Sequence, residues 1–358
     1  MTYTLCSKAQ QLEPYDPVEG QYRVRLDANE SFLLPTATDR AAMAQAAQSV
    51  AFNRYPDPLA IDLCAAFGRL YGVDPTLVTA GNGSDELISV IFSTFLQKGE
   101  TVLTVAPDFS MYRFYTSLTE NPCLTLQKNA EMQIDVDEVI RTIHEKGVRL
   151  FIFSNPCNPT SVGLEREDVR RIIRETDALI VLDEAYMDFW EQSLLDEVAD
   201  YDNLIILRTC SKMLGMAALR CGFAVANPTL TGILRAAKSP YNVNSVTQAL
   251  AAIVLSNPAY IAEYRPLLLA SRDMLFTGFR ALEQEGLIER VYPTVTNFVF
   301  IKTDQATAIQ EFLKDRGVII RRFGEHYLRI TAGTQAENKE VLDCVAFMLR
   351  QRKENHHA

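Results

Sequence analysis

Short runs of apolar, often β-branched residues alternate with helix-like segments through the first two thirds of this 358-residue chain. Strands that are buried on both faces have this character, because helices cover both sides of a parallel sheet. The right-handed crossover between parallel strands then predicts a doubly wound, mostly parallel α/β sheet. We expect strands at 101–105, 149–153, 178–182 and 204–207, and helices at 39–50, 84–95, 136–144 and 165–175.

The pattern changes near residue 245 and predicts a smaller α+β unit in the C-terminal third of the chain. We therefore expect an N-terminal arm over residues 1–45, a large domain over 46–245 and a small domain over 246–358. The expected elements of this last part are helices at 245–256, 258–285 and 306–316, strands at 297–302, 317–323 and 328–332, and a final helix from about residue 336.

Charge and cysteine content exclude several classes of protein. The 35 basic and 45 acidic side chains give a formal net charge of −10, and such a surface repels phosphate backbones and anionic lipids. The seven scattered cysteines do not resemble a disulfide framework, and the first residues lack the layout of a signal peptide. Apolar runs are too short to cross a bilayer. We expect a cytoplasmic protein that binds small molecules rather than nucleic acid or membranes.

Polar residues follow three of the predicted strands. Ligands of open α/β sheets bind beyond the carboxyl ends of the strands, where the sequences SNPCNPT, DEAY and RTCSKMLG stand. Each residue has a plain structural alternative, such as a solvated surface lysine, a helix cap or a rigid turn. Their convergence on one rim favours a binding site instead. The residues concerned are Asn158, Asp183, Tyr186, Ser211 and Lys212.

The set has a common chemical interpretation as a site for pyridoxal phosphate. That cofactor needs a lysine that binds its aldehyde covalently, and Lys212 can supply it. Asp183 can lie beside the ring nitrogen, because a carboxylate and a pyridinium each favour the charged form of the other. Asn158 and Tyr186 can form hydrogen bonds to the ring oxygen, which tune the basicity of the bound lysine nitrogen.

A phosphate cradle is expected where GNGSDE opens a helix. Backbone N–H groups at a helix N-terminus bind anions. The motif is not the dinucleotide fingerprint, because Glu86 replaces the third glycine and Gly81 follows no clear strand. A plain capping turn is the alternative. The residues expected to bind phosphate are Gly83, Ser84 and Asp85, with Ser211 and Arg220 completing the cradle.

The motifs GNGSDE, NPCNPT, DEAY, SK followed by LRCGF, and a late LRIT stand in this order along essentially the whole chain. The sequence thereby resembles the fold-type I pyridoxal-phosphate aminotransferases of class I and II. RLDANES, NRYPDP and RGVIIR resemble most closely the histidinol-phosphate aminotransferase branch. The resemblance implies a homodimeric enzyme of histidine biosynthesis that uses 2-oxoglutarate in a ping-pong transamination. It also implies that the arm covers the substrate and that the large domain binds the cofactor.

The resemblance assigns individual roles to residues around the cofactor. Lys212, Asp183 and Tyr186 correspond to the catalytic residues of the family. Phe109 in PDFSMY corresponds to the aromatic residue that stacks on the cofactor ring, and it can also be a core phenylalanine. Tyr55 in RYPDP corresponds to the tyrosine that reaches the phosphate in the neighbouring subunit, which implies two shared sites.

The resemblance also implies a set of substrate contacts. Arg329 in LRIT corresponds to the arginine that binds the substrate anion, and Arg321 assists it. Tyr15 and Asn29 are further expected contacts. Arg322 is adjacent to Arg321 on a predicted strand and should therefore point to the opposite face.

Three departures from the family pattern lie near the expected substrate. Ser161 follows Thr160 where the family has glycine, which we expect to change a loop turn and no catalytic atom. RLDANES continues into FLLP instead of a proline–tyrosine–glycine turn. The link RFGEHY between Arg321 and Arg329 is short.

Other functions remain open at this point. One is an aminotransferase for aromatic or other amino acids, and another is a pyridoxal-phosphate decarboxylase of phosphorylated amino acids. A ligand-sensing domain without enzymatic activity is disfavoured, since we expect no room for an appended DNA-binding module. His144 and His326 are isolated, so no metal site is expected.

Overall fold

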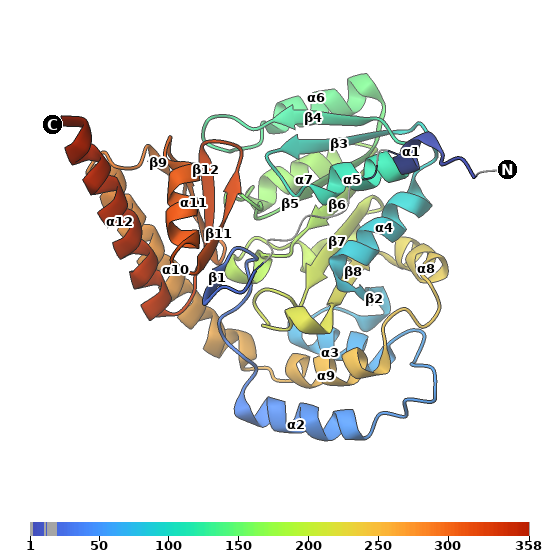
Figure 1. Cartoon of the computed structure of the whole chain (residues 1–358). Coiled ribbons are helices and arrows are strands. Elements are labelled where there is room, and N and C mark those ends of the chain that lie inside the picture. Colours follow the sequence, from blue (N-terminus) through green and yellow to red (C-terminus); the bar gives the residue numbers. More distant parts are fainter. Residues whose placement is uncertain (1–2, 11, 13–19, 358) are drawn as a thin grey trace.

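The computed structural model describes residues 3–10, 12 and 20–357 of the chain. Its elements form two sheets with helices packed around them (Figure 1). Tyr15 lies outside the described residues, so its expected substrate contact stays a prediction.

The larger sheet has seven strands in the order β2-β8-β7-β6-β5-β3-β4. All of them run parallel except β8, which is antiparallel to both of its neighbours. The predicted doubly wound, mostly parallel α/β sheet is confirmed. The strands are β2 (Val78–Asn82), β3 (Thr101–Ala106), β4 (Cys123–Gln127), β5 (Val148–Ser154), β6 (Leu179–Asp183), β7 (Leu204–Thr209) and β8 (Cys221–Ala226).

Helices cover both faces of this sheet, and alternate strand residues point into two separate cores. In β5, for example, Phe151 and Phe153 enter one core while Leu150 and Ile152 enter the other. The first core is covered by α3 (Ile61–Tyr71), α6 (Val136–Lys146), α7 (Arg166–Arg174) and α9 (Ser245–Leu255). The second is covered by α4 (Gly83–Phe95), α5 (Met111–Leu118) and α8 (Pro228–Ala237).

The smaller sheet has the order β1-β11-β12-β10-β9 and joins the two ends of the chain. β1 is parallel to β11, with Val24 beside Val318. The strands are β1 (Val24–Leu26), β9 (Arg290–Val291), β10 (Phe298–Lys302), β11 (Val318–Phe323) and β12 (Tyr327–Thr331). The helices packed on it are α10 (Tyr260–Gln284), α11 (Ala306–Lys314) and α12 (Gln335–His357) (Figure 1).

The remaining helices are short or lie apart from the two sheets. α2 packs against α9, on the outside of the large core (Figure 1). The domain limits predicted at residues 45 and 245 stay predictions. The elements are α1 (Ser7–Gln10), α2 (Ala37–Gln48), η1 (Pro75–Leu77), η2 (Met187–Phe189), η3 (Leu195–Asp200) and η4 (Ala217–Leu219).

Two features of the larger sheet differ from the sequence predictions. Gly81 lies inside β2, so the expectation that it follows no clear strand is wrong. Glu86, at the position of the missing glycine, accepts hydrogen bonds from Asn82 N and from Asn242 Nδ2. It therefore fixes the loop that opens α4.

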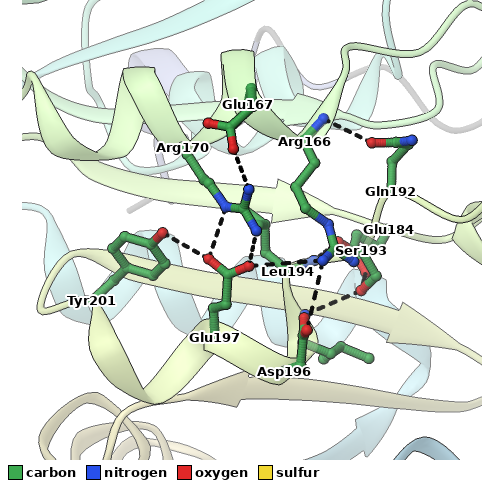
Figure 2. Close-up of polar contacts among 11 residues, drawn as sticks. Arg166, Glu167, Arg170, Glu184, Gln192, Ser193, Leu194, Asp196, Glu197 and Tyr201 are labelled. Carbon is green, nitrogen blue, oxygen red and sulfur yellow. Dashed lines mark hydrogen bonds and ion pairs between the residues drawn. The ribbon is translucent and has the colours of Figure 1, made fainter.

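Charged side chains tie the segment after β6 to α7. Arg170 of α7 bridges Glu167 and Glu197, and the hydroxyl of Tyr201 also donates to Glu197 (Figure 2). The buried Glu184, directly after β6, accepts from Ser193 Oγ at 2.6 Å (Figure 2). Both ends of the segment are thus fixed, which holds the end of β6 in place.

Helix length and composition were compared with what a membrane span needs. Within the described residues, no single helix is both long and apolar enough to span a bilayer. Among the described helices, α9 and α10 are long and apolar enough when taken together, but the chain bends by 84° between them.

Gly222 of β8 offers a test of the packing behind α4. An added Cβ would lie 2.5 Å from the backbone of Gly83 and Ser84. We expect Gly222→Ala to lower the free energy of unfolding by about 2 kcal/mol, because rigid backbone must shift. Gly232→Ala is the control, since that glycine lies in α8 with open space around it. It should stabilise by about 1 kcal/mol. Urea denaturation of both variants measures this, and an unchanged midpoint for Gly222→Ala would show that α4 can move.

Candidate active site

The carboxyl ends of β5, β6 and β7 meet at one rim of the large sheet and face the small sheet. The segment after β1 runs between them, and its residues contact side chains from both sheets. Five of the residues predicted from the sequence meet here. They are Asn29, Asn158, Tyr186, Lys212 and Arg329.

Asp183 is a buried carboxylate at the end of β6, and its charged neighbours are acids. It accepts hydrogen bonds from the hydroxyl of Tyr112 at 2.8 Å and from the backbone of Ala185 at 3.1 Å. The pKa of Asp183 is raised to about 7. Burial is the largest cause, and the negative charges of Asp108 and Asp85 act in the same direction, while the two hydrogen bonds lower the pKa. A cation bound beside this carboxylate would relieve the cost of burying its charge.

Lys212 follows β7 and carries an amine suited to nucleophilic chemistry. Its Nζ donates to the carbonyl oxygen of Ala28 at 2.9 Å and lies 5.9 Å from the centre of the Tyr186 ring. Burial and the positive charge of Arg329 lower the pKa of the Lys212 amine to about 8. A larger fraction of this amine is therefore neutral, and able to attack a carbonyl group, than for an ordinary lysine.

Tyr186 is held from two sides. Asn29 Nδ2 donates to its hydroxyl at 2.7 Å, and its ring meets the ring of Phe298 edge to face at 5.3 Å. Burial raises the pKa of the Tyr186 hydroxyl to about 12, so the hydroxyl keeps its proton and can donate it in a hydrogen bond. The side chain of Asn29 is also hydrogen-bonded to Thr331, and its expected contact with substrate stays a prediction.

Arg329 of β12 joins the small sheet to the rim. Its guanidinium donates to Asn158 Oδ1 and to the carbonyl oxygen of Asp27. Arg321 is paired directly with Arg329 across β11 and β12, which places both side chains on the same face. Arg322 donates to Gln310 of α11, so it points to the other face as expected.

The residues predicted to bind phosphate lie at and around the N-terminus of α4. The left-handed backbone of Gly83 (φ +75°) leaves room for the guanidinium of Arg220, which would lie 2.9 Å from an added Cβ. Ser211 is buried nearby on the segment after β7. The carboxylate of Asp85 is paired with Arg220 at 3.7 Å and would repel a phosphate, so its contribution to the cradle is restricted to its backbone.

Two predicted cofactor contacts lie at the edges of this arrangement. Phe109 precedes α5 and packs against Tyr112 edge to face at 5.5 Å, next to the residue that binds Asp183. Tyr55 is 81% exposed and stacks on Tyr241 at the surface, and it forms no hydrogen bond or ring contact with the other described site residues.

Some residues at the site were not predicted from the sequence. Tyr112, the donor to Asp183, has the character of a core aromatic in the sequence. Two acceptors, the carbonyl oxygens of Asp27 and Ala28, are backbone atoms that no side-chain pattern reveals. One signal could have identified Tyr112: it stands three residues after Phe109, in the first turn of α5, so the two side chains can lie on the same side of the chain.

The sequence was compared with known families and proteins. The model of the family described as aminotransferase class I and II matches residues 22–345. The chain belongs to this family. A histidinol-phosphate aminotransferase from Clostridium novyi is 38% identical over 336 residues, which are 93% of each chain. The enzyme of that name from Pyrococcus furiosus is 30% identical over 95% of this chain and 96% of its own.

Solved structures give the same fold. The histidinol-phosphate aminotransferase of Sinorhizobium meliloti, in complex with pyridoxal-5'-phosphate, aligns with a TM-score of 0.87 at 23% identity, covering 98% of this chain and 99% of that chain. L-threonine-O-3-phosphate decarboxylase from Porphyromonas gingivalis aligns with a TM-score of 0.78 at 20% identity, covering 91% and 99%. The predicted fold-type I aminotransferase is thereby confirmed, and the chain is an enzyme that transfers amino groups.

The site fits the cofactor that this family and the S. meliloti complex support, pyridoxal phosphate. Among the described residues Asp183 forms no ion pair, and a protonated ring nitrogen would supply a positive charge beside it. At the first turn of α4, glycine at position 83 leaves a cradle beside the Arg220 guanidinium that a Cβ would fill. Lys212 carries an amine of lowered pKa on the same rim.

The pKa of Asp183 predicts how the cofactor-free protein responds to pH. The folded state keeps a proton that the unfolded chain loses, so stability falls as the pH rises from about 4, the unfolded value, to about 7. Asp183→Asn carries no such charge. We expect the variant to be more stable than the parent above about pH 7 and equally stable below about pH 4.

Thermal unfolding of the two cofactor-free proteins across this range measures the effect. Addition of pyridoxal phosphate should reverse the order, because only the aspartate gains a pairing with the ring nitrogen. A difference in stability that is the same at every pH would mean that Asp183 does not titrate in this window.

Proposed function

We propose that this enzyme is a histidinol-phosphate:2-oxoglutarate aminotransferase of histidine biosynthesis, a cytoplasmic homodimer that uses pyridoxal phosphate. The observation that carries the proposal is the pairing of Arg321 with Arg329 on the face that meets the cofactor rim. Two arginines on the same face of neighbouring strands suit a phosphate ester dianion, and one planar guanidinium also suits a carboxylate. The site can thus accept both substrates in turn.

Relatives support the same substrate. Curated proteins that are 30–38% identical over at least 90% of this chain carry the name histidinol-phosphate aminotransferase. The rival function of phospho-amino-acid decarboxylase has a structural neighbour of the same fold. That neighbour is 20% identical, so it supports no more than the shared architecture.

The residues of the rim would divide the work of the reaction among them. Bound pyridoxal phosphate withdraws electrons from the substrate α-carbon and so makes its proton acidic. Lys212, with its lowered pKa, would take that proton and return it to a neighbouring carbon. Asp183 would hold the ring nitrogen, and Tyr186 and Asn158 would donate to the ring oxygen. Arg329 would hold the anionic group of the substrate.

The phosphate of the cofactor would be bound by the first turn of α4 with Ser211 and Arg220. The ring of Phe109 would stack on the cofactor. The role of Phe109 is supported by its contact with Tyr112, which donates to Asp183. The role of Arg220 is supported by its position beside Gly83.

A single-turnover screen of amino donors tests the function. Conversion of the bound cofactor to its amine form is followed by absorbance with glutamate, histidinol phosphate, phenylalanine and O-phosphothreonine in turn. We expect glutamate and histidinol phosphate to react, with kcat/KM for phenylalanine lower by at least about tenfold, because phenylalanine carries neither a phosphate dianion nor a second carboxylate. The Lys212→Ala variant is the control and should form no borohydride-reducible adduct.

Two outcomes of this screen would contradict the proposal. Release of carbon dioxide from O-phosphothreonine would identify a decarboxylase. Phenylalanine or another neutral donor reacting faster than histidinol phosphate would identify an aminotransferase with a different substrate.

The proposed homodimer rests on an exposed apolar surface around Tyr55. Phe52 is 79% exposed and precedes Tyr55 in the segment between α2 and α3, and Ile61, the first residue of α3, is 60% exposed. Exposed apolar groups of this kind favour contact with a second copy of the chain. Tyr55 would then reach the phosphate in the partner's site.

Mixing two inactive variants tests the shared site. Lys212→Ala and Tyr55→Ala should each lose most activity, and a mixed dimer would contain one intact site with Lys212 from one chain and Tyr55 from the other. We expect activity to reappear after the two proteins exchange subunits, to about a quarter of the parent value in an equal mixture. A mixture that stays inactive while sedimentation shows mixed dimers would exclude Tyr55 from the partner's site.

A further inference from the structure

Ser161 has a backbone conformation that its residue type disfavours. Its φ is +65° and it is fully buried in the loop after β5, three residues beyond Asn158. A glycine would adopt this left-handed conformation without a Cβ clash. Strain of this kind persists where the surroundings fix the residue for another reason. The side chain of Ser161 shows what that reason is.

The hydroxyl of Ser161 contacts the segment that precedes β10. Ser161 Oγ lies 2.7 Å from Thr294 Oγ1 and 2.6 Å from Thr296 Oγ1, and it accepts from Val295 N at 3.1 Å. Thr294 Oγ1 in turn donates to the carbonyl oxygen of Phe298 at 2.6 Å. One proton arrangement satisfies all of these groups: Thr296 donates to Ser161, Ser161 to Thr294, and Thr294 to Phe298.

The partner segment is rigid and leads directly to the active site. Arg272 of α10 donates to the carbonyl oxygens of Thr294 and Thr296 at 3.0 and 3.1 Å. The next residues form a wall of the site. Asn297 donates to the carbonyl oxygen of Asn29, and the ring of Phe298 lies against both Tyr186 and the guanidinium of Arg329.

The loop that carries Ser161 is also held in place relative to Asn158, at the rim of the large sheet. Ser161 N donates to the carbonyl oxygen of Cys157 at 2.8 Å, so its position is set relative to Asn158. Asn158 accepts a hydrogen bond from Arg329. The loop after β5 and the small sheet are therefore joined at two points, once through Asn158 and Arg329 and once through Ser161 and the two threonines.

We propose that Ser161 is a positioning residue that presets Arg329 for the anionic substrate. Its hydroxyl fixes the loop of Asn158 against residues 294–298 and so sets the distance between Asn158 and Arg329 before substrate arrives. The inference rests on the proposed function in one respect, the binding of the substrate anion by Arg329. A serine that only shaped the turn would be replaced by glycine with no loss, because glycine relieves the strained φ.

The test compares Ser161→Gly with the parent in the full-length, cofactor-loaded enzyme. Amide hydrogen exchange of residues 294–298 reports the link directly and needs no catalysis. We expect exchange there to become about tenfold faster, and KM for glutamate to rise by about tenfold with the dissociation constant of pyridoxal phosphate unchanged. Glycine keeps the turn, so the variant should fold.

A matched pair of variants separates the hydroxyl from the shape of the side chain. Thr296→Val removes the hydroxyl and should reproduce the effects of Ser161→Gly, whereas Thr296→Ser keeps it and should behave as the parent. Glu120→Gly is the control for backbone strain, because Glu120 also has a positive φ (+58°) but lies at the turn between α5 and β4.

Ser161→Gly with the KM and the exchange rates of the parent would overturn the proposal. Equal losses of glutamate and cofactor binding would overturn it too, because they would indicate a general loss of structure. If no amino donor reacts with the parent enzyme, the proposed function fails, while the exchange rates still decide whether the hydroxyl joins the two segments.

Discussion

The arrangement of the rim depends on a buried carboxylate whose charged neighbours are acids. Asp183 ends a strand at the centre of the large sheet, where burial raises its pKa to about 7 and the nearby charges are negative. An ionised group in such a place destabilises the fold unless something positive binds beside it. The sheet keeps it there because Tyr112 and Ala185 fix both of its oxygens. In the function proposed here, a protonated ring bound beside Asp183 would offset this cost in stability.

Lys212, on the segment after β7, has a pKa shifted in the opposite direction. Burial and Arg329 lower the pKa of the Lys212 amine, so Asp183 and Lys212 are both shifted toward their neutral forms. Groups shifted in this way are typical of sites where protons are moved near neutral pH. The charge of Arg329 makes the lysine amine more reactive, and in the proposed function the same charge would hold the anionic substrate.

The sequence predicted the parts of this arrangement that depend on strand ends. Asp183 and Lys212 were expected to meet because the carboxyl ends of parallel strands share one edge, and they do share it. β8 was not predicted. It is antiparallel to β7 and follows it without a crossover α-helix, so it falls outside the alternation of strands and helices from which the other strands were predicted. The carbonyl oxygen of Ala28 was not predictable, since backbone acceptors leave no mark in the residue pattern.

Ser161 shows a different limit of sequence reasoning. Its replacement of a family glycine was visible, and it was interpreted as a change of turn. The positive φ and the contacts with Thr294 and Thr296 depend on residues more than a hundred positions away. Local preferences carry no information on such contacts, so the departure could be located from the sequence but not explained.

The pairing of β1 with β11 has a consequence for how the protein is made. The strand at Val24 is synthesised long before the strand beside it, at Val318. The segment after β1, which supplies acceptors to Lys212 and Arg329, therefore has no strand to hold it in place until β11 has been made. The rim is completed only when β1 pairs with β11, so a chain interrupted before β11 would leave the large sheet without these acceptors in position.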